Sequence, residues 1–189
     1  RTGIVTTSSL TDATPASFYA HQPERSLSEE IASDFLTSNN DILIGGGAAS
    51  FTIRKDQRNL LIDLSRKGYT VSKTNSSIDT IHSTKYVVID NTSAISMKQG
   101  RGDFLVKSLQ KSIASCSQGD TPFFIMAEGA QIDDGGHDND MEFVVRELLD
   151  FDQAIGEAIK FVDSNRETLL IVTADHETGG LTLLGGDIS

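Results

Sequence analysis

The sequence predicts an α/β fold, with a largely parallel sheet and helices on both of its faces. Short apolar and β-branched runs alternate along the whole chain with segments whose apolar residues recur at helical spacing. Two of the apolar runs also end in carboxylate and histidine side chains, and open α/β sheets keep their sites at the carboxyl ends of their strands. We expect a single α/β domain over residues 1–189.

The first third of the chain is expected to hold two strands and two helices. Residues 3–8 are rich in β-branched side chains and predict the first strand. Thr14 followed by Pro15 predicts a helix start, with the hydroxyl as the cap and the proline at the first helical position. A second helix is predicted over 26–36, and Asp41–Ile44 is predicted to be a buried strand.

A glycine triplet, Gly45-Gly46-Gly47, follows the second predicted strand. A glycine-rich loop can hold a phosphate, but this one lacks the Lys-Ser/Thr ending of a P-loop and the spacing of a dinucleotide fingerprint. We therefore interpret it as a tight turn with close backbone packing.

The rest of the chain continues the alternation of strands and helices. Helices are predicted over 56–67, 103–117 and 140–165, and strands over 69–73, 85–90, 123–127, 168–173 and, in part, 181–184. The longest helix carries a broad apolar stripe, expected to cover the sheet, made of Val144, Val145, Leu148, Phe151, Ile155, Ala158, Ile159 and Val162.

Composition excludes several functional classes. The net charge of −11, from 27 acidic and 16 basic residues, argues against nonspecific binding to nucleic acid. The single cysteine, Cys116, excludes an intramolecular disulfide and a cysteine-rich zinc cluster. No apolar run approaches the roughly 20 residues that span a bilayer.

Carboxylates and histidines follow two of the predicted strands. Glu128 directly follows the run 123–127. Asp133 and His137 come next and are four residues apart, so that one helical turn would place both on the same side of a helix. Asp175 and His176 follow the run 168–173 in the same way. An isolated Asp/His pair is more often a surface pair, but two such strand ends predict a metal site, and this mixture of nitrogen and oxygen ligands suits Zn²⁺.

Three further polar residues lie near the predicted first helix. Asp12 and Thr14 are ordinary capping residues by local evidence alone. Arg25 could hold a phosphate through two parallel hydrogen bonds, although an exposed ion pair is the ordinary role of such a residue. The local sequence leaves both alternatives open for all three.

Taken together, four segments resemble the metal-dependent alkaline phosphatases, in that family's order and over nearly the whole chain. They are Asp12-Ala13-Thr14-Pro15 with Ala20-His21 and Arg25, then Leu43-Ile44-Gly45-Gly46-Gly47, then Met126-Ala127-Glu128-Gly129-Ala130-Gln131-Ile132-Asp133 with His137, and finally Val172-Thr173-Ala174-Asp175-His176. The resemblance implies the family's three-layer α/β/α fold, here incomplete.

The resemblance also implies cofactors and roles. Glu128 and Thr14 correspond to Mg²⁺ ligands, with Asp12 reaching that ion through water. The first of two zinc ions would be held by Asp133 and His137, and the second by Asp175 and His176. Arg25 corresponds to the arginine that binds phosphate. The implied reaction is the hydrolysis of phosphate monoesters through a phosphoserine intermediate.

The sequence departs from the family's pattern at three places. It lacks the Asp-Ser-Ala motif of the nucleophilic serine, the early aspartate that bridges two metal sites, and the late histidine that completes the first zinc site. We therefore interpret the chain as an internal fragment of a longer alkaline phosphatase, inactive alone. The family resemblance implies a periplasmic or secreted parent, often a homodimer.

Two other functions stay open from the sequence. One is a sulfatase or a relative of phosphoglycerate mutase, which would share the fold and the Asp-His strand end. The other is a noncatalytic domain that binds metal or docks a partner. The Asp-Ala-Thr-Pro and Glu-Gly-Ala-Gln-Ile-Asp segments favour the phosphatase.

Overall fold

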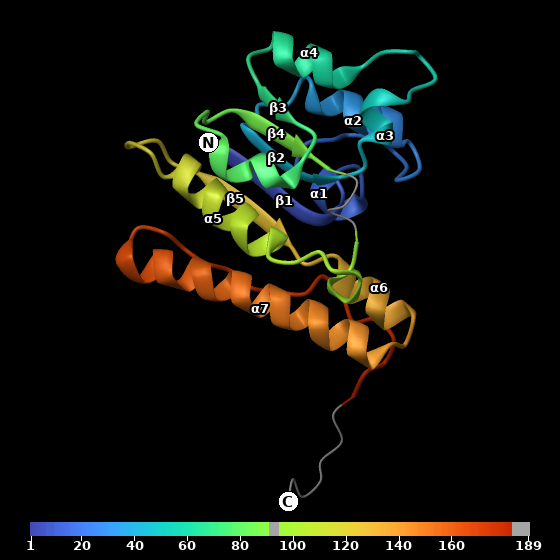
Figure 1. Cartoon of the computed structure of the whole chain (residues 1–189), viewed down its shortest axis with the longest axis vertical. Coiled ribbons are helices and arrows are strands. Elements are labelled where there is room, and N and C mark those ends of the chain that lie inside the picture. The colour runs from blue at the N-terminus through green and yellow to red at the C-terminus, as the bar shows by residue number, and fades with distance from the viewer. Residues whose placement is uncertain (91–94, 183–189) are drawn as a thin grey trace, which may run out of the picture.

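The computed structural model describes residues 1–90 and 95–182, and within them the strands form one parallel sheet in the order β3-β4-β2-β1-β5 (Figure 1). The strands are β1 (Thr2–Ser9), β2 (Ile42–Gly46), β3 (Thr70–Ser72), β4 (Tyr86–Ile89) and β5 (Phe124–Glu128). All four strand pairs are parallel, which confirms the predicted α/β class.

Helices connect successive strands and cover both faces of the sheet (Figure 1). They are α1 (Ala13–Ala16), α2 (Ser28–Phe35), α3 (Ala49–Thr52), α4 (Leu60–Arg66), α5 (Phe104–Cys116), α6 (Gln131–His137) and α7 (Met141–Ser164), with short 3-10 turns η1 (Asn75–Thr80) and η3 (Met97–Gln99). One hydrophobic cluster lies under α1 to α4 and a second lies under α5 and α7.

The central strands divide their side chains between these two clusters. Neighbouring residues of a strand point to opposite faces, so Ile4 of β1 enters the first cluster and Val5 the second, both with no exposed surface. Leu43 and Ile44 of β2 are divided in the same way. Burial on both faces explains why these strands read as continuous apolar runs.

The predicted stripe on the longest helix is only partly correct. Val145, Leu148 and Ile159 of α7 are exposed, whereas Glu147 and Asp150 are buried. The two carboxylates can be buried because the Arg101 guanidinium contacts both. Charge pairing has therefore overridden the apolar pattern on part of this helix.

The predicted strand over 168–173 is wrong for this structure. The segment turns back along α7 toward α6 without joining the sheet (Figure 1). Leu170 packs against the second cluster, but Leu169 and Ile171 are 81% and 73% exposed. A strand apolar on both faces needs a layer on each side, and within the described residues only the second cluster packs against this segment. Of the predicted strand at 181–184, residues 183 and 184 lie outside the described residues, and the first two are not in a strand.

None of the helices in the described part of the chain is apolar over enough of its length to cross a bilayer.

Candidate metal centre

The ends of β1 and β5 bring the first polar groups together. The two strands run side by side in parallel, with Thr6 opposite Glu128. The residues that follow each strand therefore emerge at the same edge of the sheet, where α1 and α6 begin. The segment 173–178 reaches the same edge, because its Thr178 contacts Asp133 of α6.

Glu128 is the most enclosed carboxylate of the group. Its Oε2 accepts a hydrogen bond of 2.6 Å from the Thr6 hydroxyl. Burial raises the pKa of Glu128, and the charges of Asp12 and Asp175 raise it further, whereas hydrogen bonds from Thr6 and Thr14 lower it. These influences place Glu128 near Asp175, which the strand-end pattern predicted to belong to the site, and near Asp12 and Thr14, whose roles there the family resemblance implied.

Asp12 is the N-cap residue of α1, but its side chain makes no capping hydrogen bond and contacts two other groups instead. Its Oδ2 accepts a hydrogen bond of 2.6 Å from the Ser8 hydroxyl, and its Oδ1 lies 3.2 Å from an Arg25 guanidinium nitrogen. The Arg25 side chain is 74% exposed, so a ligand in solution can reach it. Thr14 was predicted to cap a helix that starts at Pro15, but α1 begins two residues earlier, at Ala13. The Thr14 side chain is thereby free to turn toward Glu128.

The predicted pair on α6 is present. Asp133 and His137 lie one helical turn apart, with Oδ2 of the aspartate 3.4 Å from Nε2 of the histidine. Their side chains are 44% and 70% exposed. Because both side chains are exposed, and an exposed pair of this kind contributes little to stability, both groups are available to a ligand.

The second predicted pair lies on the segment after α7. Oδ2 of Asp175 lies 3.4 Å from Nε2 of His176. The carbonyl of Glu177, and then the charge of Asp175, raise the pKa of His176. The Thr178 hydroxyl donates to Oδ1 of Asp133 and lies 3.1 Å from Nδ1 of His176. This one side chain therefore connects the two predicted pairs.

Close packing between backbones holds this segment against α6. A Cβ added at Gly136 would lie 2.7 Å from the carbonyl oxygen of Thr178, so the absence of a side chain permits the contact. Gly179 adopts a φ of +82°, which glycine allows without strain, and a Cβ there would lie 2.2 Å from the Gly136 carbonyl oxygen. Gly135 and Gly136 both lie within α6, so their role in this structure is close packing and not a turn.

The donor types fit the predicted ions. The group around Glu128 offers carboxylate and hydroxyl oxygens, which suit Mg²⁺, and each Asp/His pair offers the oxygen and nitrogen that suit Zn²⁺. Within the described residues, no three His, Cys, Asp or Glu side chains are arranged to hold one ion. Each zinc pair would thus need a further ligand, and the assignment of each metal ligand remains a prediction.

The glycine triplet has the structural role predicted for it. Gly45 packs so closely under β1 that a Cβ would lie 2.8 Å from the Thr6 methyl and from a Leu10 methyl. Gly47 has a φ of +83°, as the turn requires.

Sequence reasoning missed Thr6, Ser8 and Thr178. Each of these hydroxyls donates to a carboxylate of the predicted site, namely Glu128, Asp12 and Asp133. A threonine in a strand is ordinary, so residue type gave no signal. The alternate spacing of Thr6 and Ser8 on one strand was the only available hint.

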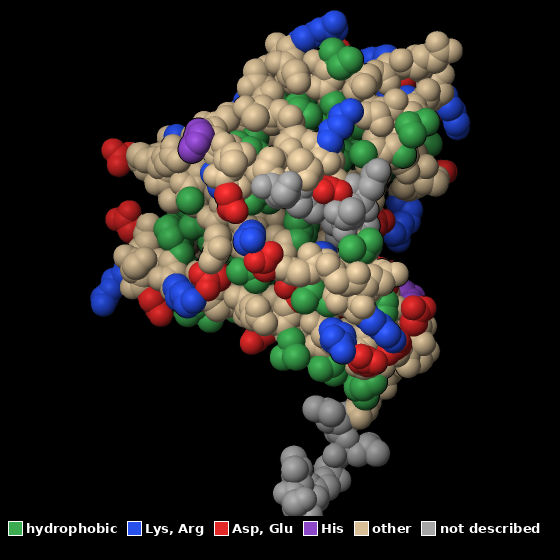
Figure 2. All heavy atoms as spheres, viewed as in Figure 1, with side chains coloured by type: hydrophobic (Ala, Val, Ile, Leu, Met, Phe, Trp, Pro, Cys, Tyr) green, Lys and Arg blue, Asp and Glu red, His purple; other side chains and the backbone are tan. Residues whose placement is uncertain are grey.

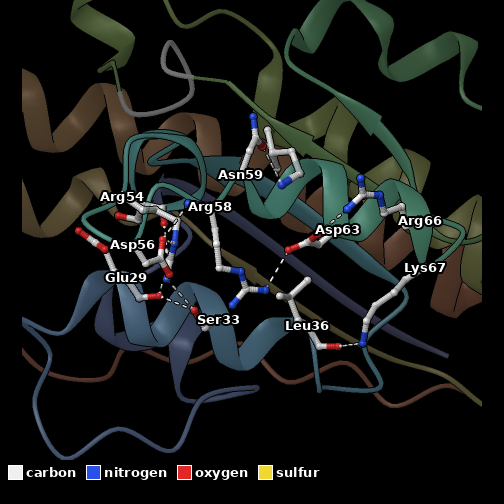
Figure 3. A network of polar contacts seen from close by, with 12 residues as sticks. Glu29, Ser33, Leu36, Arg54, Asp56, Arg58, Asn59, Asp63, Arg66 and Lys67 are labelled. Atoms are coloured by element: carbon white, nitrogen blue, oxygen red, sulfur yellow. Dashed lines mark hydrogen bonds and ion pairs between the residues drawn. The ribbon is translucent and has the colours of Figure 1, made fainter.

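A separate charged cavity lies between α2 and α4 (Figure 3). Its volume is about 610 Å³, and it is lined by Ser33, Asp34, Leu36, Thr37, Arg58, Asp63, Arg66 and Lys67. Its basic groups already have partners: Arg58 lies 2.9 Å from Asp63, and Lys67 donates to the Leu36 carbonyl at 2.6 Å. It shares no residue with the metal centre.

Fold and site together define an α/β protein with a candidate metal centre at the carboxyl edge of a parallel sheet. More specifically, the chain belongs to the alkaline phosphatase family, whose sequence model matches residues 1–189. This match confirms the family that the four sequence motifs indicated.

Individual relatives agree with this assignment. Alkaline phosphatase 3 of Bacillus subtilis is 36% identical over 200 residues, covering 96% of this chain and 41% of its own length. The repressible alkaline phosphatase of Saccharomyces cerevisiae is 32% identical over 216 residues, covering 95% of this chain and 38% of its own length.

Solved structures share the fold. The alkaline phosphatase of the Antarctic bacterium TAB5 matches with a TM-score of 0.90 at 44% identity, over 97% of this chain and 55% of that chain. A mutant of that enzyme with Mg bound in its M3 site has a TM-score of 0.88 at 44% identity, over 95% of this chain and 53% of its own. The chain thus spans 41% of the Bacillus relative and 55% of the TAB5 enzyme.

Proposed function

We propose that the chain is part of a metal-dependent alkaline phosphatase that hydrolyses phosphate monoesters through a phosphoserine intermediate, with the serine outside these 189 residues. The observation that carries the proposal is the convergence of three segments at one sheet edge. Thr178 connects the two Asp/His pairs, and the charges of Asp12 and Asp175 act on Glu128. Membership of the alkaline phosphatase family supports the reaction class.

Each group has a proposed role. Glu128 and Thr14 hold Mg²⁺, and Asp12 reaches it through water. The first zinc ion takes Asp133 and His137, and the second takes Asp175 and His176. When bound, two such ions stabilise the attacking and leaving oxygens of an in-line displacement.

Arg25 is proposed to bind the phosphate group of the substrate. A guanidinium presents parallel N–H donors that match phosphate oxygens, and it stays charged at any working pH. Asp12 orients this guanidinium from one side at 3.2 Å, and 74% of the arginine side chain remains exposed.

The isolated chain is proposed to be inactive. It lacks the nucleophilic serine motif, and neither zinc pair has a third protein ligand within the described residues. Incomplete coordination leaves clustered carboxylates less neutralised and weakens metal binding. The parent enzyme is proposed to be periplasmic or secreted, and homodimeric.

Zinc titration calorimetry on the 189-residue chain tests the metal assignment. His137→Ala and His176→Ala should each weaken zinc binding, whereas the exposed His82→Ala should not. Equal binding in all three variants would overturn the assignment.

Assays with competing phosphate and sulfate esters test the reaction. The longest reading frame containing this segment should hydrolyse the phosphate ester selectively, and the 189-residue chain should hydrolyse neither. Turnover by the isolated chain, with contaminating enzyme excluded, would contradict its predicted inactivity. Preference for the sulfate ester would favour the sulfatase alternative.

A further inference from the structure

Thr6 contacts the site in a way that its sequence context did not indicate. It lies near the end of β1, directly opposite Glu128 of β5, and its side chain has no exposed surface. Its hydroxyl donates to Oε2 of Glu128 at 2.6 Å. No role in the proposed phosphatase is assigned to this residue.

The direction of the Thr6 hydroxyl is fixed by two contacts. The backbone N–H of Ser8 donates to Oγ1 of Thr6 at 3.1 Å, so one lone pair of that oxygen is occupied. The Thr6 methyl packs over Gly45, where even a Cβ would come within 2.8 Å of it. The rotamer is therefore held by packing, and the O–H is directed at the carboxylate.

We propose that Thr6 is a positioning residue for the divalent cation held by Glu128. A hydroxyl that donates to one carboxylate oxygen fixes the orientation of the carboxylate and leaves its other oxygen free for a cation, as groups that support metal ligands do. Mg²⁺ demands near-ideal octahedral geometry, so a carboxylate free to rotate binds it less well. This inference rests on the assignment of Glu128 to magnesium in the proposed function.

The chain offers a matched set of variants. Thr6→Val keeps the shape of the side chain and removes only the hydroxyl, whereas Thr6→Ser keeps the hydroxyl and removes only the methyl. Thr7→Val is the control, because Thr7 is equally buried on the same strand and its hydroxyl has no hydrogen-bond partner among residues 1–90 and 95–182. Thr6→Ala removes the hydroxyl in a second way should valine prevent folding.

The experiment is a Mg²⁺ titration of the ¹⁵N-labelled 189-residue chain, followed by amide chemical shifts, which measures weak binding and confirms the fold of each variant. Thr6→Val should raise the Mg²⁺ dissociation constant about tenfold, the effect typical of a group that supports a metal ligand. Thr6→Ser and Thr7→Val should stay within about twofold of the unmodified chain.

Glu128→Gln separates failure of this inference from failure of the magnesium assignment. If Glu128→Gln abolishes binding while Thr6→Val and Thr6→Ala bind like the unmodified chain, the role of Thr6 is overturned and the magnesium assignment stands. If Glu128→Gln binds as well as the unmodified chain, or the unmodified chain does not bind, the assignment fails and the role of Thr6 fails with it.

Discussion

The Thr178 hydroxyl donates a hydrogen bond to the Asp133 carboxylate, 45 residues earlier in the chain. The same hydroxyl lies 3.1 Å from His176, so a single side chain contacts a member of each predicted zinc pair. The two pairs come from segments that share no strand pairing, and this contact and the backbone packing at Gly136 hold the segments together. Their relative position therefore depends on how closely the 175–180 segment approaches α6.

Gly136→Ala should separate the two pairs. Its new methyl would lie 2.7 Å from the Thr178 carbonyl oxygen, which is backbone and can move only by shifting the segment. We expect zinc binding about tenfold weaker, as when a metal ligand loses its support. Zinc titration calorimetry on the variant and the unmodified chain measures the change.

Gly156→Ala is the matched control for this change. Gly156 lies within α7, and a Cβ there would meet nothing within 4 Å. The substitution should leave zinc binding unchanged and stabilise the chain by about 0.5–1 kcal/mol, because alanine is the better helix former. Equal zinc affinity in both glycine variants would refute the packing role of Gly136.

Arg101→Met should destabilise the chain strongly. The guanidinium contacts Glu147 and lies 2.8 Å from Asp150, and all three side chains are at most 2% exposed. Removing the cation leaves two buried carboxylates without a counter-charge, although the Met97 N–H still donates to Glu147, and breaking a buried pair costs about 3–5 kcal/mol. Urea unfolding followed by circular dichroism measures the loss.

Two comparisons sharpen this prediction. Arg146→Met breaks the exposed pair with Glu142, at 2.8 Å, and should cost less than about 1 kcal/mol. Adding Glu147→Met and Asp150→Leu to Arg101→Met should recover most of the loss, because the cost arises from uncompensated charge. A loss in Arg101→Met no larger than in Arg146→Met would contradict the argument.

Periodicity and strand-end chemistry predicted much of the fold and the candidate pairs. The four-residue spacing of Asp133 and His137 requires a helical turn, and α6 supplies it. The continuous apolar runs predicted strands buried on both faces, as Ile4 and Val5 of β1 are. Both inferences depend on local geometry alone, which sequence spacing encodes directly.

The rest depended on contacts between distant segments. Arg101 pairs with the buried Glu147, which lies 46 residues away in the sequence, and Thr6 donates a hydrogen bond to Glu128, which lies 122 residues away. No local sequence pattern encodes either contact. The segment 168–173 has the composition of a buried strand, but strand formation also requires backbone pairing, and within the described residues this segment pairs with no strand although β5 keeps an open edge. Composition indicates that a segment can be buried as a strand, but it does not indicate whether the segment will pair with another strand.

Because of the Cys116 thiol, the free energy of unfolding should fall as the pH rises through the alkaline range. Burial raises the pKa of Cys116 from 9.0 to about 11. Between these values the folded chain holds a proton that the unfolded chain has lost, so stability falls as pH rises, by up to about 1.4 kcal/mol per pH unit. Below the lower value this group contributes no pH dependence.

Cys116→Ala isolates this contribution. At pH 8 the variant should be less stable, because it leaves a small cavity in the second hydrophobic cluster. The difference in free energy of unfolding between the variant and the unmodified chain should become about 1–2 kcal/mol smaller at pH 10.5 than at pH 8. Urea unfolding at both pH values measures it. Tyr69, whose pKa burial raises to about 12, titrates equally in both proteins. A difference that stays constant with pH would rule out the thiol as the source.

The apolar segment 168–173 should make the isolated chain self-associate. Leu169 and Ile171 are 81% and 73% exposed, and within the described residues β5 pairs with β1 alone, so its other edge is open. Hydrophobic side chains also lie on the outer surface of α7, where Leu148 and Leu149 are 51% and 56% exposed (Figure 2). An open strand edge beside exposed apolar side chains is a site of association.

Ile171→Lys tests this prediction, because a charge beside an open edge opposes association. The average mass in sedimentation equilibrium should rise with the concentration of the unmodified chain and rise less in the variant. Ile53→Lys is the control, since Ile53 is 80% exposed but follows α3, away from β5. An equal reduction in both variants would show that added charge alone is responsible, and no reduction in either would place the association elsewhere on the surface.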